Sequence, residues 1–381
     1  MPAFVPPNRL LLGPGPSAVP ARVLQATAQP TIGHLDPAFI GMMDELNDLV
    51  RYAMQTENHC TLTISGPGSA GMEACIGNLV EAGDTVVVCR NGVFGERMRQ
   101  LVIRAGATAI AVDQTWGEPI DPVALDQALR EHPEASLVAF VHAETSTGVL
   151  NDAEQLARIA DEHGCLSVMD CVASVGGVPV RIDEWGIDAA YTGSQKCLAC
   201  PPGLAPATFG PRAIERIQAR KTPTASWMFD ISELTRYWSG GARRNYHHTA
   251  PVNALYGLHE ALVLLREEGL DASWKRHGSV SSLACSGLAD LGLQLTVNEA
   301  HRAPQLLVVQ VPHGVDDAQF RRQLLDVEGI EIGGGLGPGA GKVWRIGLMG
   351  HGAREANVER LLGAMSRQFD ALGLQGIERA S

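Results

Sequence analysis

Short apolar segments alternate with amphipathic segments along the chain between about residues 60 and 210. The apolar segments suit buried strands, and in the segments between them apolar residues recur every three or four positions, as in helices. The pairs are TLTISG and SAGMEACIGNLV, DTVVVC and GVFGERMRQLVIRAG, TAIAVD and PVALDQALREH, and SLVAFVHAE and AEQLARIADEHG, followed by CLSVMDCV and AAYTGS. The pattern predicts an α/β fold of repeated βαβ units, with a largely parallel sheet covered by helices on both faces.

The pattern changes toward the C-terminus. An amphipathic segment at 253–266 leads away from the predicted sheet, and beyond Gly269 helical segments surround the apolar segments QLLVVQV, IEIGG and KVWRIGLMG. This arrangement indicates a second, smaller α+β domain. We therefore predict an N-terminal arm over residues 1–20, a large domain over 21–267 and a small C-terminal domain over 268–381.

The charge balance excludes some classes of partner. The chain has 381 residues, 45% of them hydrophobic, and carries 42 acidic against 30 basic residues, a formal net charge of −12. An acidic chain of this kind does not suit a nucleic acid or an anionic membrane as its main partner. Because there is no uninterrupted run of about 18 apolar residues and prolines interrupt the N-terminal segment, we expect a cytoplasmic protein without a membrane span.

The cysteines do not suggest a disulfide framework. The chain has eight, and several of them, such as Cys89, Cys165 and Cys171, lie within apolar segments, as expected of reduced thiols in a core. Cys197 and Cys200 form a Cys-x-x-Cys pattern, but no second pair or suitably spaced histidines accompany it as in a zinc site. We predict that both pack structurally and that no metal is bound.

One lysine stands where a cation is costly. In AYTGSQKCLACPPGLA, residues 190–205, Lys196 follows a segment typical of a buried strand and precedes a turn set by Pro201, Pro202 and Gly203. Burial disfavours an ammonium, so lysines in such places often have lowered pKa values and act as amine nucleophiles. The position of Lys196 suggests a Schiff base.

The first strand of the predicted sheet ends in a glycine-rich turn, SGPGSAGMEA. In open α/β sheets, ligands bind outside the carboxyl ends of the strands. Here Gly66, Gly68 and Gly71 allow the backbone to approach a ligand, and Ser69 and Ala70 open a helix whose free N–H groups suit a phosphate. Tight packing explains such a turn equally well.

Asp170 follows the apolar segment CLSVM. An aspartate at the end of a buried strand needs a cationic or hydrogen-bonding partner. A protonated pyridine nitrogen would serve, and so would the backbone amides of the next turn. Because Lys196 lies one strand further along the chain, both side chains can face the same crevice.

Arg345 lies in the segment KVWRIGLMG, in which it alternates with Trp344 and Ile346. It therefore points either to solvent or into a cavity, and solvent is the usual place for arginine. The preceding loop GGGLGPGAGK can pass close to a ligand, which favours the cavity. A guanidinium that grips a carboxylate with two hydrogen bonds is what an enzyme acting on amino acids requires.

Seven motifs follow one another along the chain: SGPGSAGMEA, NGVFGER, HAETSTGV, VMDCVASVGG, GSQKCLACPPG, YHHT and GKVWRIGLMG. Each alone is weak, but together they resemble the class V aminotransferases of PLP fold type I, and specifically the alanine/serine–glyoxylate aminotransferase family. The resemblance runs from LLGPGPS to the terminal helix. It implies a large domain with a mainly parallel seven-stranded sheet, a smaller α+β domain, and pyridoxal 5'-phosphate as the cofactor.

The resemblance also implies a role for each motif residue. Lys196 forms the Schiff base with the cofactor and Asp170 pairs with the pyridine nitrogen. Val172 and Phe94 pack on the two ring faces, and Phe94 departs from the animal members, which carry tryptophan there. The other implied contacts are Gly68, Ser69, Ala70 and Gln195 near the phosphate, Thr145 near the ring hydroxyl, and Gly15 and Arg345 near the substrate.

Tyr246 and Thr249 are implied to bind the phosphate of the neighbouring subunit in a homodimer with shared active sites. They belong to the polar loop RRNYHHTAP, which lies beyond the last predicted strand of the sheet. From the sequence, this loop has no obvious route back to the phosphate turn of its own subunit. Two-fold symmetry would let each subunit supply the same loop to the other.

The implied reaction is a ping-pong transamination of a small amino acid, alanine or serine, with glyoxylate or pyruvate. Asp170 would hold the proton on the pyridine nitrogen and Lys196 would carry the substrate proton. Ureidoglycine–glyoxylate aminotransferases look similar but carry asparagine at the position of Tyr246. A cysteine desulfurase usually has histidine where this chain has Gln195, and a DNA-binding regulator would need an additional basic domain.

Overall fold

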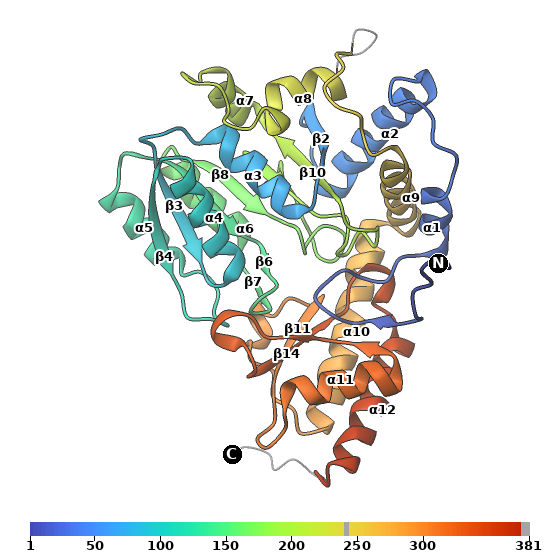
Figure 1. Ribbon diagram of the computed structural model, residues 1–381. Helices are drawn as coiled ribbons and strands as arrows, with labels where there is room; N and C mark the ends of the chain where they lie inside the picture. Colours follow the sequence, from blue (N-terminus) through green and yellow to red (C-terminus); the bar gives the residue numbers. More distant parts are fainter. Residues whose placement is uncertain (240–243, 375–381) are drawn as a thin grey trace.

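The computed structural model describes residues 1–239 and 244–374, and two hydrophobic cores lie within them (Figure 1). The larger core surrounds the central sheet and extends along the chain from Val23 to Leu270. The smaller core lies C-terminal to it and also includes Leu12 from the predicted arm. Gly269 separates α9 (Val252–Glu268) from α10 (Leu270–Asp290), close to the predicted boundary between the domains.

The central sheet has seven strands in the order β2-β10-β9-β8-β5-β3-β4. β10 is antiparallel to both of its neighbours, and the other neighbouring strands are parallel. The strands are β2 (Cys60–Ser65), β3 (Thr85–Arg90), β4 (Thr108–Asp113), β5 (Ala135–Val141), β8 (Leu166–Asp170), β9 (Ala189–Tyr191) and β10 (Leu204–Phe209). The predicted mainly parallel, seven-stranded sheet is confirmed.

Helices cover both faces of this sheet. From β2 through β3 to β4 the chain moves toward one edge, and from β4 through β5, β8 and β9 it returns. Because such crossovers are right-handed, the helices of the two runs lie on opposite faces. The first run contains α3 (Gly68–Leu79) and α4 (Val93–Arg104), in front of the sheet in Figure 1, and the second contains α5 (Pro122–Glu131) and α6 (Ala153–Glu162).

Further helices flank the other edge of the sheet. α2 (Pro37–Met54) packs against β2, and α1 (Ala21–Thr27) and α2 both pack against α9. α2 begins at an Asp-Pro pair, in which the Asp36 carboxylate accepts a 2.8 Å bond from the Ala38 N–H. α7 (Pro211–Gln218) and α8 (Ile231–Trp238) follow β10. Among the described residues, no helix is long and apolar enough to cross a membrane.

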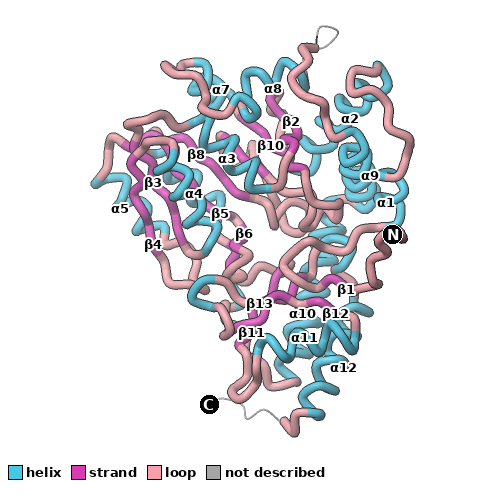
Figure 2. Tube along the Cα trace, viewed as in Figure 1, coloured by secondary structure: helices cyan, strands magenta, loops and turns pink. Residues whose placement is uncertain are grey.

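The small domain contains an antiparallel sheet in the order β11-β14-β13. Trp344 of the central strand stacks on Phe320, with ring centroids 4.4 Å apart, in the smaller core. The arm strand β1 (Leu10–Leu11) pairs in parallel with β12 (Ile330–Glu331), as Figure 2 shows. The elements are β11 (Leu306–Gln310), α11 (Asp317–Glu328), β13 (Gly333–Gly334), β14 (Val343–Gly347) and α12 (Glu355–Ala371).

Candidate active site

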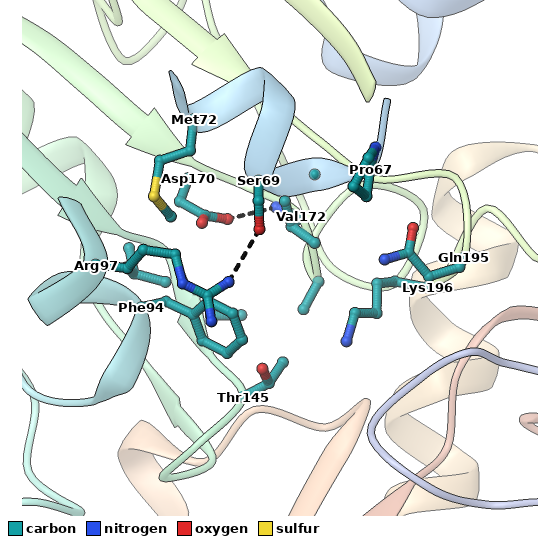
Figure 3. A pocket seen from close by; sticks show the side chains of 14 residues that line it. Pro67, Ser69, Met72, Phe94, Arg97, Thr145, Asp170, Val172, Gln195 and Lys196 are labelled. Carbon is teal, nitrogen blue, oxygen red and sulfur yellow. Dashed lines mark hydrogen bonds between the residues drawn. The ribbon is translucent and has the colours of Figure 1, made fainter. Parts of the chain in front are cut away.

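A cavity of about 150 Å³ lies at the carboxyl ends of the parallel strands (Figure 3). It is reached by the turns that follow β2, β3, β5, β8 and β9, so residues distant in the sequence meet there. Its lining comprises Pro67, Gly68, Ser69, Met72, Phe94, Arg97, Val141, Ala143, Thr145, Asp170, Val172, Ala173, Gln195 and Lys196. Eight of the residues singled out in the sequence, from Gly68 to Lys196, are therefore brought together.

Lys196 enters the cavity from the turn after β9, with Asp170 and Phe94 on the other side in Figure 3. The side chain is buried and its ammonium donates to the backbone oxygen of Pro14 in the N-terminal arm. Burial lowers the pKa of Lys196 to about 8, and the nearby Arg345 adds repulsion. The lysine is therefore poised to release its proton near neutral pH.

Gly15 does not line the cavity but packs against Lys196. A Cβ at this position would lie 2.7 Å from the lysine Cδ, and the backbone has a φ of +106°. Both conditions require glycine. On the same arm, the Ser17 hydroxyl donates to the backbone oxygen of Lys196 at 2.7 Å. The arm thus fixes both ends of the catalytic lysine candidate.

Asp170 ends β8 with a buried carboxylate. One oxygen accepts from the N–H of Val172 at 2.8 Å, and the other accepts from the hydroxyl of Tyr191 at 2.7 Å. Burial raises the pKa of Asp170 to about 6 despite these two bonds. The turn-capping role considered from the sequence is present, and the carboxylate still reaches the cavity.

Phe94 and Val172 reach the cavity from different elements. Phe94 lies in the first turn of α4, and Val172 follows β8. Val172 packs against Gly68, where an added Cβ would lie 2.8 Å from a valine methyl group. The small residue at the start of α3 therefore allows the valine to occupy its place in the cavity wall.

The phosphate-turn candidates lie together at the start of α3. Gly68 and Ser69 line the cavity, whereas the N–H of Ala70 donates to the backbone oxygen of Pro67 at 2.7 Å and Ala70 does not line it. Gln195 reaches the same cavity, and its side-chain oxygen is buried without a partner among the described residues. An unpaired amide oxygen suits a group that donates a hydrogen bond, whereas the amide N–H groups of Gln195 suit a phosphate.

Arg345 is buried in β14 and does not point to solvent. Its Nε donates to the backbone oxygen of Gly334 at 2.7 Å, and its Nη1 donates to that of Thr145 at 3.1 Å. Thr145 lines the cavity, so the guanidinium lies directly behind its wall. A guanidinium has five N–H groups, and these two bonds leave donors for a carboxylate.

Tyr246 and Thr249 do not line the cavity. Tyr246 is 62% exposed, and its hydroxyl lies 3.5 Å from that of Thr249. From the sequence, we expected their loop to have no route to the phosphate turn of its own chain. This expectation is wrong for one residue of the loop, His248. His248 of this loop forms a 2.7 Å hydrogen bond with Ser65, the first residue of the glycine-rich segment SGPGSAGMEA.

Glu144, within the motif HAETSTGV, is a further functional residue, which the sequence analysis does not identify. Its buried carboxylate accepts from the N–H groups of Phe94 and Gly95 at 3.0 and 3.3 Å, and from the N–H and hydroxyl of Ser146 at 3.0 and 2.6 Å. It therefore joins the start of α4 to the turn after β5. Its place at the end of the apolar segment SLVAFVHAE is the signal that could have found it.

Tyr191, Arg97 and Pro14 were also missed. Tyr191 resembles an ordinary core aromatic in the sequence, and Pro14 acts through its backbone oxygen, which no side-chain pattern reveals.

Cys197 and Cys200 are buried free thiols in different hydrophobic clusters, and burial raises the pKa of each to about 12. Within residues 1–239 and 244–374, no group of three or more histidine, cysteine or acidic residues could hold a metal ion.

Comparisons with known proteins agree on one family. The model of "Aminotransferase class-V" matches residues 9–361. The chain belongs to the class V aminotransferases. Alanine–glyoxylate aminotransferase of Oryctolagus cuniculus is 40% identical over 361 residues, which are 94% of this chain and 92% of that protein.

Two solved structures of aminotransferases are also close. Alanine–glyoxylate aminotransferase from Nostoc sp. superposes with a TM-score of 0.94 at 46% identity, covering 96% of this chain and 97% of that one. Ureidoglycine–glyoxylate aminotransferase from Bacillus subtilis gives a TM-score of 0.95 at 36% identity, covering 99% and 96%. The chain is therefore a pyridoxal-phosphate-dependent aminotransferase with the fold of type I enzymes.

The residues of the cavity fit this cofactor. A buried amine, a buried carboxylate, and a glycine-rich helix start lie around one small space, as an aldehyde, a pyridine nitrogen and a phosphate require. Gln195 on the cavity wall adds an amide whose N–H groups can donate to a phosphate oxygen. The fit thus rests on side chains of this protein.

Proposed function

We propose that this aminotransferase transfers the amino group of a small amino acid, alanine or serine, to glyoxylate or pyruvate. The main support is that Lys196, Asp170 and the first turn of α3 line one cavity. The Arg345 guanidinium lies behind the wall of this cavity. The names and identities of the alanine–glyoxylate aminotransferase relatives support this substrate class. The products are an oxo acid and glycine or alanine.

Lys196 is the proposed catalytic residue. Bound pyridoxal phosphate supplies an aldehyde that holds the amino group and a ring that takes up the electrons released at Cα. Lys196 binds the cofactor through its amine and, once displaced, its neutral Nζ removes the proton from the substrate Cα and later returns one. Its pKa of about 8 supports both steps, because each protonation state is accessible near neutral pH.

Asp170 is proposed to hold a proton on the pyridine nitrogen. Burial makes the charge of this carboxylate costly, as its raised pKa of about 6 reports. A cation beside the carboxylate offsets this cost. Tyr191 and the N–H of Val172 orient the carboxylate. Phe94 and Val172 are the proposed contacts of the two ring faces.

The polar periphery completes the proposed site. The N–H groups of Gly68 and Ser69, with Gln195, would hold the phosphate, and Thr145 would approach the ring hydroxyl. The N–H of Ala70, implied by the resemblance as a further contact, already donates to Pro67. Arg345 would bind the substrate carboxylate with its remaining donors, beside Gly15 of the arm. These contacts orient the substrate Cα toward Lys196 and exclude water from it.

A homodimer with shared sites is proposed for the loop of Tyr246 and Thr249. The exposure of Tyr246 supports it, because this side chain is available to a second chain. The eight free cysteines favour a reducing compartment such as the cytoplasm.

The ureidoglycine–glyoxylate activity is the second candidate, because the Bacillus subtilis structure is as similar in fold. A matrix of initial rates distinguishes the two, with alanine, serine and ureidoglycine as donors and glyoxylate and pyruvate as acceptors. We expect alanine or serine to be the fastest donor, with parallel double-reciprocal lines as for a ping-pong mechanism. A clear preference for ureidoglycine would contradict the proposal.

A further inference from the structure

Arg97 connects two parts of the cavity. It lies one turn after Phe94 on α4, and its guanidinium carbon is 4.9 Å from the centroid of the Phe94 ring. Its Nη1 donates to the hydroxyl of Ser69 at 2.9 Å, as the dashed line in Figure 3 marks. The arginine therefore reaches from α4 across to the first turn of α3.

The charge of Arg97 is not neutralised by a carboxylate. Arg90 and Arg99, its neighbours in sequence, both form ion pairs with Glu96. In the described part of the chain, no carboxylate lies within ion-pair distance of Arg97. Arg97 is exposed, but it also lines the cavity, where its unpaired positive charge favours an anionic ligand.

The proposed phosphate site lacks such a charge. A phosphate monoester carries a charge of about −1.5 to −2 at neutral pH, whereas Gly68, Ser69 and Gln195 are neutral and a helix start offers about half a positive charge. Lys196 is the one other cation among the cavity-lining residues, and its amine serves the aldehyde. Arg97 is therefore the residue placed to balance the phosphate.

We propose that Arg97 is a cationic ligand of the cofactor phosphate, which it holds together with Ser69. The proposal rests on the proposed function and adds a charge to its phosphate site. One N–H of the guanidinium donates to Ser69, and the planar group retains donors that can bind a phosphate oxygen. The contact with the Phe94 ring limits the orientations of the guanidinium.

Two forms of the cofactor test this proposal. Pyridoxal has the ring and aldehyde of pyridoxal phosphate but no phosphate group. The full-length protein, freed of cofactor, is titrated with each compound, and the dissociation constants are measured by absorbance. We expect Arg97→Ala to raise the dissociation constant of pyridoxal phosphate at least about tenfold. The dissociation constant of pyridoxal should stay within about twofold of that of the unaltered protein. Arg97→Lys keeps the charge, so its affinity for pyridoxal phosphate should lie between those of the unaltered protein and Arg97→Ala.

Arg99→Ala is the matched control, because Arg99 lies on the same helix, is paired with Glu96 and does not line the cavity. It should bind both compounds as the unaltered protein does. Equal losses for both compounds in Arg97→Ala would show that the arginine acts through Phe94 or the fold, and unchanged binding of both would also overturn the proposal. Circular dichroism of each variant establishes that it is folded.

Steady-state kinetics at saturating pyridoxal phosphate separate this question from the proposed function. Arg97→Ala should then keep the KM values for alanine and glyoxylate, because its defect lies in holding the cofactor. Raised KM values with unchanged cofactor affinity would assign Arg97 to the substrate and overturn the proposal. An unaltered protein that binds pyridoxal phosphate but transaminates none of the donors would refute the proposed function alone.

Discussion

Burial moves the pKa values of two groups in the cavity toward neutrality. It lowers the pKa of Lys196 to about 8 and raises that of Asp170 to about 6. The lysine can therefore lose its proton near neutral pH, and the carboxylate becomes a good partner for a cation. Both shifts arise because the side chains leave the ends of buried strands, where little water reaches them.

The pKa of Lys196 sets a pH dependence for cofactor attachment. Only the neutral amine attacks an aldehyde, and at pH 7 about a tenth of the lysine is neutral if its pKa is about 8. The rate at which pyridoxal phosphate attaches to the cofactor-free protein should rise about tenfold per pH unit up to about pH 8 and then level off.

Stopped-flow absorbance measures this attachment rate. Lys196→Ala is the control that should show no covalent phase, and Lys221→Ala, which removes an exposed lysine, should behave as the unaltered protein. A rate that keeps rising to pH 10 would show that the lysine has its ordinary pKa.

Asp170→Asn should keep the fold and lose at least about 100-fold in kcat, because an amide cannot hold the pyridinium proton by its charge. Asp188→Asn is a matched control, since Asp188 is also buried and accepts from Ser167 but does not line the cavity. It should lower thermal stability and keep kcat. Comparable kcat values for both variants would make Asp170 structural.

Arg345→Lys should raise KM for both the amino acid and the oxo acid by about tenfold or more. An ammonium is a point charge and cannot reproduce a two-pronged bond to a carboxylate. Initial rates over a range of each substrate measure the effect. If neither KM changes, the guanidinium serves only Gly334 and Thr145, which it contacts in the structure.

At this scale the sequence predicts residues that end strands and misses residues that act between segments. Lys196, Asp170 and Ser69 each follow an apolar segment, so their place at the sheet edge can be predicted. Tyr191 bonds a residue 21 positions away, and Glu144 bonds one 50 positions away. Such pairs depend on strand order, which periodicity alone does not determine.

Among the elements, α4 owes its position to a carboxylate from another element. Glu144 accepts from the N–H groups of Phe94 and Gly95 at the start of the helix, where negative charge is favourable. Gly92 makes room, because a Cβ there would lie 2.3 Å from the Glu144 side chain. The carboxylate therefore fixes the position of the ring-contacting Phe94.

Glu144→Gln should weaken the binding of pyridoxal phosphate about tenfold. The reason is that the amide nitrogen of glutamine cannot accept from the N–H groups that bind the carboxylate. If the effect passes through Phe94, adding Glu144→Gln to Phe94→Ala should weaken the binding of pyridoxal phosphate little further. Cofactor titrations of the four proteins in this double-mutant cycle measure the coupling. Independent, additive losses would show that Glu144 supports the fold without positioning the ring.

The strand β10 shows where element prediction fails. It lies between β2 and β9 and is antiparallel to both, although Pro206 stands in its middle. A proline removes a backbone donor and argues against a central strand, so the sequence gives no reason to place one here. The parallel strands β3, β4 and β5, each followed along the chain by an amphipathic helix, carry a repeated signal and can be predicted.

For the whole molecule, mixed dimers test whether sites are shared. Lys196→Ala and a Tyr246→Ala, Thr249→Ala double variant are unfolded and refolded together. With shared sites, half of the randomly paired dimers are mixed and each has one native site, so activity should return to about a quarter of the unaltered level.

Refolding each variant alone is the control, and neither should recover activity. If the loop serves only its own chain, every site keeps a lesion and mixing restores nothing. A single-chain mass in sedimentation experiments would remove the dimer as well.

The pairing of β1 with β12 has a consequence for biosynthesis. Leu10 pairs with Ile330, so 330 − 10 = 320 residues separate the partners along the chain. At the usual rates of translation, the arm strand leaves the ribosome on the order of tens of seconds before its partner. Because the same arm contacts Lys196 through Pro14 and Ser17, the surroundings of the lysine are completed only when synthesis is nearly over. A nascent chain therefore carries this apolar strand without its partner strand throughout most of its synthesis.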